Sequence, residues 1–244
     1  MKTNMRFGTL LLATIFACVG SAHAAEDNSL YVEAFGGNAG NVFGMPDGKN
    51  NVGASFDGRT KSIDMSRNGL FGVRMGYKIS SNWHTDLSYY SVDSDLDWSA
   101  SFPPTTAFPQ GATTNFIAEL DSQVLLVSAY YSFNSESKLS PYVGLGLGVA
   151  RNKLHRATES FEGQQFASIK NSTQQSVAYR AAVGADYSIS EKWKLNMDLS
   201  LINLSEATSG ATRTLPGGLL EPIGRYEFDD IWRASFTLGL RYSF

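Results

Sequence analysis

The chain has 244 residues, 43% of them hydrophobic, and its 20 basic and 23 acidic side chains give a formal net charge of −3 at pH 7. This length allows one domain, and the acidic balance argues against nucleic acid as a partner. Beyond the first 24 residues, no apolar run is long enough to form a membrane helix.

The N-terminal segment has the pattern of a secretory signal peptide. Lys2 and Arg6 precede an apolar run over 7–19, and Ala22 and Ala24 have the spacing of small residues that precedes a cleavage site. We therefore predict a cleaved signal peptide over 1–24 and one exported domain over 25–244.

Cys18 is the one cysteine of the chain, and cleavage after Ala24 removes it. The mature protein then has no disulfide and must be held together in another way, which a closed barrel would supply. Lipoprotein cleavage just before Cys18 is the alternative, but Phe16 fits that pattern poorly.

Seven later segments alternate between apolar and polar residues, which predicts strands with one face in an apolar environment. In chain order their outward apolar positions are Leu30, Val32 and Ala34; Phe71, Val73, Met75, Tyr77 and Ile79; Trp83, Leu87 and Tyr89; Leu125, Val127, Ala129, Tyr131 and Phe133; Val143, Leu145, Leu147 and Val149; Val177, Tyr179, Ala181, Val183, Ala185, Tyr187 and Ile189; and Trp193, Leu195, Met197, Leu199 and Leu201.

An eighth alternating segment, from Trp232 to Phe244, ends the chain. Aromatic residues stand at both of its ends, as amphipathic rings do where a strand crosses the two surfaces of a bilayer. Across all eight segments we predict an aromatic girdle made of Tyr77, Trp83, Tyr131, Phe133, Tyr187, Trp193, Trp232, Tyr242 and Phe244.

A chain that ends on such a strand resembles bacterial outer-membrane β-barrels, in particular the small eight-stranded OmpA/OmpX-type and opacity-like surface proteins. The polar–x–Gly–x–x–aromatic–x–aromatic ending, met by Thr237, Gly239, Tyr242 and Phe244, resembles the insertion signal of that class. The resemblance implies a monomer in the outer membrane of a Gram-negative bacterium. Its expected partners are outer-membrane lipid and lipopolysaccharide, the barrel-assembly machinery, and a host or extracellular ligand at the loops.

The predicted connections alternate in length, as in barrels of this class. Three are short: Ser80–Asn82, Asn134–Ser140 and Ser190–Lys192; four are long: Asn38–Arg67, Asp97–Phe116, Leu154–Thr173 and Ala207–Arg225. We predict an all-β fold, an eight-stranded antiparallel up-and-down transmembrane β-barrel with short periplasmic turns and four long extracellular loops. Both termini then lie on the periplasmic side.

The inward positions of the predicted barrel are rich in charge: Glu33, Arg74, Lys78, Asp86, Arg180, Asp186, Lys194, Asp198, Arg233 and Arg241. Folding the hairpins predicts four contacts, namely Asp186 opposite Lys194, Arg180 diagonal to Asp198, Arg74 and Lys78 near Asp86, and Glu33 near Arg233 or Arg241. A charged lumen is either an ion path or a plug of ion pairs, and the narrow bore of eight strands favours the plug.

One wall of the lumen carries Gly144, Gly146 and Gly148. These positions leave room for a bulky neighbour such as Tyr130 or Tyr142, or for a small pocket.

Catalytic and metal-binding patterns are sparse. His84, Asp86 and Ser88 share the inward face of one strand, but successive residues of that face are about 7 Å apart, too far for a catalytic relay.

Asp93, Asp95 and Asp97 also share a face and could bind a divalent cation or bridge to lipopolysaccharide phosphate; the alternative is a solvated strand extension. We predict no resident metal and no cofactor.

We predict a non-enzymatic surface protein whose loops serve adhesion, interaction or membrane organisation, as members of the resembled families do. The alternative is a narrow porin-like channel or a conduit for small hydrophobic molecules. A third possibility is an outer-membrane lipid-modifying enzyme.

Overall fold

The computed structural model describes residues 29–41, 49–50, 59–66, 68–104, 109–133 and 137–244. The predicted signal peptide lies outside them. The described residues form strands, turns and irregular segments, and none of them form a helix long and apolar enough to cross a membrane.

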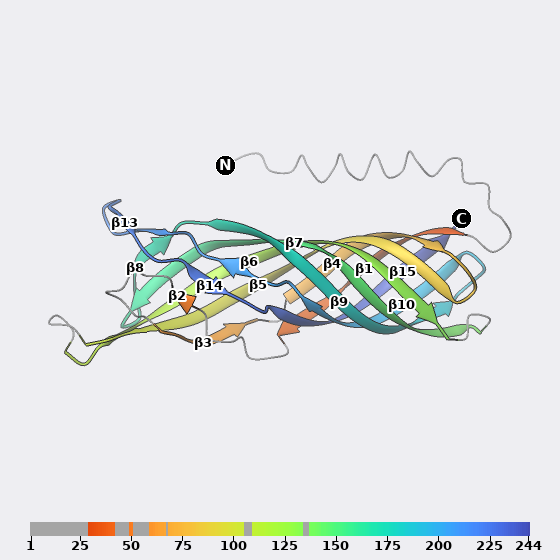
Figure 1. The fold of residues 1–244 in the computed structure, drawn as a ribbon, viewed down its shortest axis with the longest axis horizontal. Helices are drawn as coiled ribbons and strands as arrows, with labels where there is room; N and C mark the ends of the chain where they lie inside the picture. Colours follow the sequence, from red (N-terminus) through yellow and green to blue (C-terminus); the bar gives the residue numbers. More distant parts are fainter. Residues whose placement is uncertain (1–28, 42–48, 51–58, 67, 105–108, 134–136) are drawn as a thin grey trace.

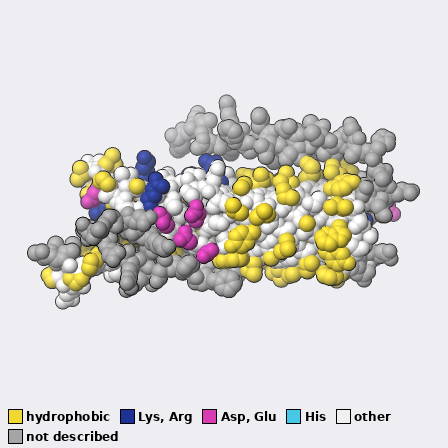
Figure 2. Space-filling view, in the orientation of Figure 1, with side chains coloured by type: hydrophobic (Ala, Val, Ile, Leu, Met, Phe, Trp, Pro, Cys, Tyr) yellow, Lys and Arg dark blue, Asp and Glu magenta, His cyan; other side chains and the backbone are white. Residues whose placement is uncertain are grey.

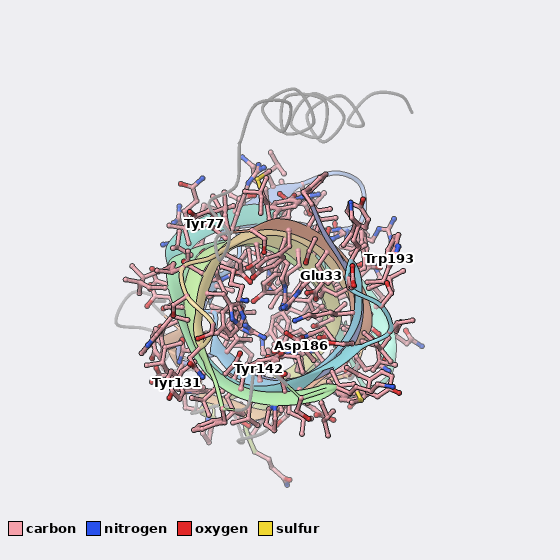
Figure 3. All side chains as sticks on the ribbon, turned by 90° about the vertical axis from the view of Figure 1, so that its right-hand side faces the viewer. Glu33, Tyr77, Tyr131, Tyr142, Asp186 and Trp193 are labelled. Carbon is pink, nitrogen blue, oxygen red and sulfur yellow. The ribbon has the colours of Figure 1, made fainter. Side chains whose placement is uncertain are left out.

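Eight long strands form a closed antiparallel ring. They are β1 (Leu30–Asn41), β4 (Asn68–Lys78), β5 (Trp83–Phe102), β6 (Ala112–Ser132), β7 (Leu139–Phe161), β9 (Ser172–Ser188), β10 (Trp193–Asn203) and β15 (Trp232–Ser243). Each strand pairs with the next around the ring, and the β1–β15 pair, with Glu33 opposite Arg241, closes it. Viewed down its axis, the ring surrounds an interior filled with side chains (Figure 3). The predicted eight-stranded barrel is confirmed.

Two of the predicted short connections, Ser80–Asn82 and Ser190–Lys192, lie at one end of the barrel, which we call the turn end; the third, Asn134–Ser140, lies partly outside the described residues. The β4–β5 and β9–β10 turns are closed by backbone hydrogen bonds from Ile79 N to Trp83 O (2.8 Å) and from Ile189 N to Trp193 O (2.9 Å). The C-terminus lies at this end too (Figure 1), and Phe244 N donates to the carbonyl of Leu30 (3.0 Å). We call the opposite end the extended end.

An apolar band covers the outside of the barrel next to the turn end (Figure 2). The predicted outward residues form it as one contiguous apolar surface, which soluble monomers rarely expose; Leu145 (71%) and Phe71 (68%) are its most exposed large side chains. Aromatic pairs lie along both borders of the band. At the turn end the ring centroids of Trp83 and Tyr131 are 5.2 Å apart, and those of Trp193 and Tyr242 are 5.0 Å apart. At the other border the ring centroids of Tyr179 and Trp232 are 5.5 Å apart. The band has the character of a lipid-facing surface flanked by girdles.

Three strands run far beyond this band. β5, β6 and β7 contain 20, 21 and 23 residues, whereas about 9–11 suffice to cross a bilayer. Shorter strands pair with their outer parts: β3 (Arg59–Met65) with β5, β8 (Gln164–Ile169) with β7, and β12 (Thr212–Thr214) with both β8 and β13 (Leu220–Pro222). We call this region, together with the small sheet described next, the extension.

A second sheet packs inside the extension. It consists of β2 (Lys49–Asn50), β14 (Tyr226–Phe228) and β11 (Ala207–Thr208). Trp98 stacks on Phe116 with ring centroids 5.0 Å apart, and both rings contact Tyr226, while Trp98 also contacts Phe228 at 5.1 Å. The extension therefore has a hydrophobic core, which continues into the barrel as far as Phe35, Leu70 and Tyr90.

The predicted bounds of two long loops need correction. Asp97–Phe116 and Leu154–Thr173 contain strand pairing out to Phe102 opposite Ala112 and Phe161 opposite Gln164. The prediction followed outward apolar residues, and beyond Tyr89 the apolar positions switch to the inward face, as in Val92 and Leu96. The first connection now begins after Phe102 and ends before Ala112, whereas the second is replaced by the short hairpin between β7 and β8 and by two residues between β8 and β9.

Candidate functional site

The charged residues predicted for the lumen meet mostly within the apolar band, and Arg241 is the centre of one group. Its Nε lies 2.9 Å from Glu33 Oε2 and its Nη1 lies 2.6 Å from Asp186 Oδ2, so three strands are tied together. All three side chains are buried. Figure 3 shows Glu33 and Asp186 inside the ring, whereas Trp193 and Tyr131 point away from it.

A second group joins Arg180 to Asp198, a contact that the sequence predicted, although the register places Arg180 opposite Ile202, four residues from Asp198. Tyr142 donates its hydroxyl to Asp198 Oδ2 (2.8 Å), and Arg180 Nη1 donates to the Tyr130 hydroxyl (3.0 Å). Asn196 Nδ2 donates both to Tyr142 (3.0 Å) and to Asp186 (2.7 Å), which links the two groups. The lumen is thus crossed by one continuous polar network.

We call this network of buried charged and polar side chains the polar plug, and Arg74 completes it on the β4 side. Its guanidinium lies 3.5 Å from Glu33 and 3.7 Å from Asp86, and it stacks over the Phe35 ring at 4.4 Å. A cavity of about 10 Å³ lies beside it, lined partly by Arg74, Ser88 and Thr237. That volume holds about one water molecule, so it offers no passage for a solute.

One of the predicted lumen contacts is wrong. Asp186 faces Asn196 and not Lys194, which faces Ser188, because the β9–β10 turn is centred on Glu191 and not on Ser190. Lys78 and Lys194 are half-buried near the turn end. Of the two predicted neighbours of Asp86, Arg74 lies near it as expected, at 3.7 Å, whereas the contact with Lys78 stays a prediction.

Arg233 stands apart from the plug. It is fully buried at the border with the extension, where its Nη2 donates to the carbonyls of Ala39 (3.1 Å) and Ser66 (3.2 Å). Of the two predicted partners of Glu33, Arg241 is therefore the correct one. Within the described residues no carboxylate lies within ion-pair distance of Arg233.

Glycines make room for the plug, as the sequence suggested. A Cβ on Gly144 would lie 2.3 Å from the Tyr130 ring, and one on Gly184 would lie 2.5 Å from the Tyr142 ring. A Cβ on Gly239 would lie 2.3 Å from Glu33 Oε1. Gly239 of the proposed insertion signal is therefore also needed for packing inside the barrel.

The other residues of that signal fall on both faces of β15. Thr237 is buried inside, while Tyr242 and Phe244 belong to the outer girdle with ring centroids 5.2 Å apart. Recognition of these residues by assembly machinery stays a prediction.

His84 packs inside the plug. Its ring stacks on Tyr130 at 4.7 Å and contacts Tyr31 and Tyr142 edge-on. Among the described residues no hydrogen bond joins His84 to Asp86 or Ser88, in keeping with their spacing along one strand.

Asp93, Asp95 and Asp97 face outward on the extension, as a solvated strand would. Asp93 is directly opposite Asp121, and Asp97 is opposite Asp64. Partial burial, and then repulsion from Asp121, raises the pKa of Asp93; partial burial, and then repulsion from Asp64 and Asp95, raises the pKa of Asp97. In the described part of the chain no three metal-ligating side chains come close enough to hold an ion, so the predicted cation site gains no support.

A further charged group on the outer face of β6 and β7 was not predicted. His155 Nε2 lies 2.8 Å from Asp121 Oδ2, and Arg156 Nη1 lies 2.8 Å from Glu119 Oε1. Arg156 occupies a bulge in β7 with a φ of 52°. Alternation alone cannot locate such a bulge, because it depends on the pairing register of two strands.

The family model described as "Outer membrane protein beta-barrel domain" matches residues 9–244. The outer membrane protein OprG from Pseudomonas aeruginosa is 15% identical, with a TM-score of 0.55 over 89% of this chain and 96% of that chain. A major outer membrane protein from Thermus thermophilus is 13% identical, with a TM-score of 0.51 over 91% of this chain and 100% of that chain. These likenesses show the fold. No curated protein matches the sequence.

Proposed function

Since the chain belongs to the outer membrane protein beta-barrel domain family, and is thus a protein of the Gram-negative outer membrane, we propose that it is a non-conducting, non-enzymatic surface barrel. In this proposal the folded extension, which carries the exposed loops, is the part that makes contacts outside the cell. The polar side chains inside the barrel serve to stabilise its fold.

The observation that carries this proposal is the filled interior. In this proposal the polar plug closes the lumen within the band, and the connection between β10 and β15 closes it at the border with the extension. There Asn152 Nδ2 donates to the carbonyls of Leu204 (2.9 Å) and Glu206 (2.7 Å), which holds the start of the β10–β15 connection across the barrel mouth. Beyond it lies the aromatic core around Trp98.

We expect no steady single-channel current from the unmodified protein in planar bilayers. The buried ion pairs and the hydrophobic core of the described residues occupy the interior, so any current should be rare and transient. A porin reconstituted in the same way provides the positive control. Stable, stepwise conductance from the unmodified protein would contradict the proposal and favour the porin-like alternative.

Orientation is the second part of the proposal. Barrels of this family type have short periplasmic turns and longer extracellular loops, so we place the turn end and both termini in the periplasm. The extension then projects from the cell surface.

This orientation can be tested with single cysteines, because a chain cleaved after Ala24 has none of its own. We expect a membrane-impermeant maleimide on intact cells to label Gly163→Cys, at the β7–β8 hairpin, and to leave Ser190→Cys, at the β9–β10 turn, unlabelled. Both should react after the cells are broken. Labelling of Ser190→Cys alone on intact cells would invert the topology.

A second candidate function is favoured by the apolar interior of the extension. Buried residues such as Leu96, Leu120 and Leu154 continue its aromatic core, and a surface lined in this way could accept a small hydrophobic molecule if the core opened. A conduit would make cells that carry the protein take up a fluorescent apolar dye faster than cells that lack it. The surface-barrel proposal expects equal rates.

A further inference from the structure

The outer face of β7 changes abruptly from apolar to basic at the border of the band. Val149 is the last apolar outward residue, and the next two outward positions along β7 are Arg151 and Lys153, both exposed. On the neighbouring strand β9 the band ends at Val177, with Gln175 as the next outward residue. These polar side chains start where lipid acyl chains end and headgroups begin.

The sheet register gives Arg151 two amide neighbours. Arg151 is directly opposite Gln123 of β6 on one side and Gln175 of β9 on the other. Directly opposite residues in antiparallel strands have Cβ atoms about 4.5–5.5 Å apart, so the three side chains can reach one ligand. Lys153 lies one step farther out, between Asp121 and Thr173.

Among the described residues, no carboxylate lies within ion-pair distance of Arg151 or Lys153. The next basic side chains along β7, His155 and Arg156, do have carboxylates within that distance. Arg156 is held by Glu119, and His155 by Asp121. Glu119 is thus engaged by Arg156, and Asp121 lies beside His155, farther from the band, so these two carboxylates do not form ion pairs with Arg151 or Lys153.

We propose that Arg151, Lys153, Gln123 and Gln175 bind the phosphate of an outer-leaflet lipid headgroup, the phosphorylated sugar of a lipid A-type molecule. A guanidinium matches a phosphate with two parallel hydrogen bonds, an ammonium adds a point charge, and the amides donate further hydrogen bonds. A lipid and not a free phosphate is the ligand, because acyl chains can lie on the band beside Leu147 and Val149 while the phosphate meets Arg151. The proposal rests on the orientation above, which puts this border in the outer leaflet.

The test compares Arg151→Gln/Lys153→Gln with Lys138→Gln/Lys192→Gln. The second pair removes the same charge from exposed lysines at the turn end. Each protein is refolded in an uncharged detergent, and its thermal unfolding is followed by the gel shift between folded and unfolded forms. Diphosphoryl lipid A, dephosphorylated lipid A and inorganic phosphate are then added in turn.

Diphosphoryl lipid A should raise the unfolding temperature of the unmodified and control proteins, since a ligand that binds only the folded state stabilises it. The Arg151/Lys153 variant should bind it about thirtyfold more weakly, because a basic side chain near a membrane surface contributes about 1 kcal/mol. An equal response of this variant, or an equal effect of dephosphorylated lipid A, would overturn the proposal. A shift produced by inorganic phosphate alone would overturn the lipid as ligand. A protein in a detergent micelle has no inside or outside, so this assay tests lipid A binding alone. The cysteine-labelling test on intact cells tests the proposed orientation separately.

Discussion

Replacing Arg241 by alanine is expected to lower the free energy of unfolding by about 3–5 kcal/mol, because it strands charges in a buried site. Asp186 loses its one ion pair among the described residues and keeps only the hydrogen bond from Asn196 (2.7 Å). Glu33 retains Arg74 at 3.5 Å, so the larger part of the cost falls on Asp186. Urea unfolding of the refolded protein in lipid vesicles, followed by tryptophan fluorescence, measures the change.

The matched control removes the stranded charge as well. Arg241→Ala combined with Asp186→Asn should recover a large part of the loss, because a neutral amide is much cheaper to bury than a lone carboxylate. If Arg241→Ala alone unfolds within about 1 kcal/mol of the unmodified protein, as an exposed ion pair would, the plug does not stabilise the barrel. No change in conductance is expected from either variant.

Replacing Trp98 by alanine should destabilise the extension by about 3–5 kcal/mol while the membrane-spanning part stays folded. Trp98 contacts Phe116, Tyr226 and Phe228, so its loss opens a cavity between β5, β6 and the small sheet. We expect the loss of structure to appear as faster tryptic cleavage after Arg213. In the folded protein Arg213 Nη1 lies 2.8 Å from Glu159 Oε2, and its Nε lies 2.7 Å from Glu221 Oε2.

Trp83→Ala provides the control for Trp98→Ala. Trp83 is an aromatic residue on the same strand, but it faces lipid at the turn end and contacts Tyr131. Its loss should leave cleavage after Arg213 unchanged. Equal cleavage rates in the Trp98→Ala and unmodified proteins would mean that the aromatic cluster does not hold the extension together.

Alternation was sufficient to predict the barrel because lipid imposes one rule on every outward position within the band. From Phe71 to Ile79, for example, each predicted outward residue is outward in the structure. The same rule failed beyond Tyr89, where water replaces lipid outside and the apolar residues turn inward. Trp98 and Phe116 were assigned to a loop for this reason.

The lumen contacts were predicted in part because they depend on register. Arg180 and Asp198 were placed near each other since a diagonal contact tolerates a small error, whereas the Asp186 partner depends on the exact centre of the β9–β10 turn. The link between Arg241 and Asp186 crosses from β15 over β10 to β9, and no hairpin rule predicts it. Arg151 and its amide neighbours became visible only once β6, β7 and β9 were aligned.

The central claim is that the protein presents a folded, packed extension above a closed barrel. Backbone hydrogen exchange of the protein in lipid nanodiscs, resolved by peptide, tests it most directly. Residues 92–100 of β5 and 116–124 of β6 are paired along their length, so we expect their amides to be protected to a degree approaching that of the membrane-spanning strands. Complete exchange of these two segments within seconds, as in a mobile loop, would contradict the account.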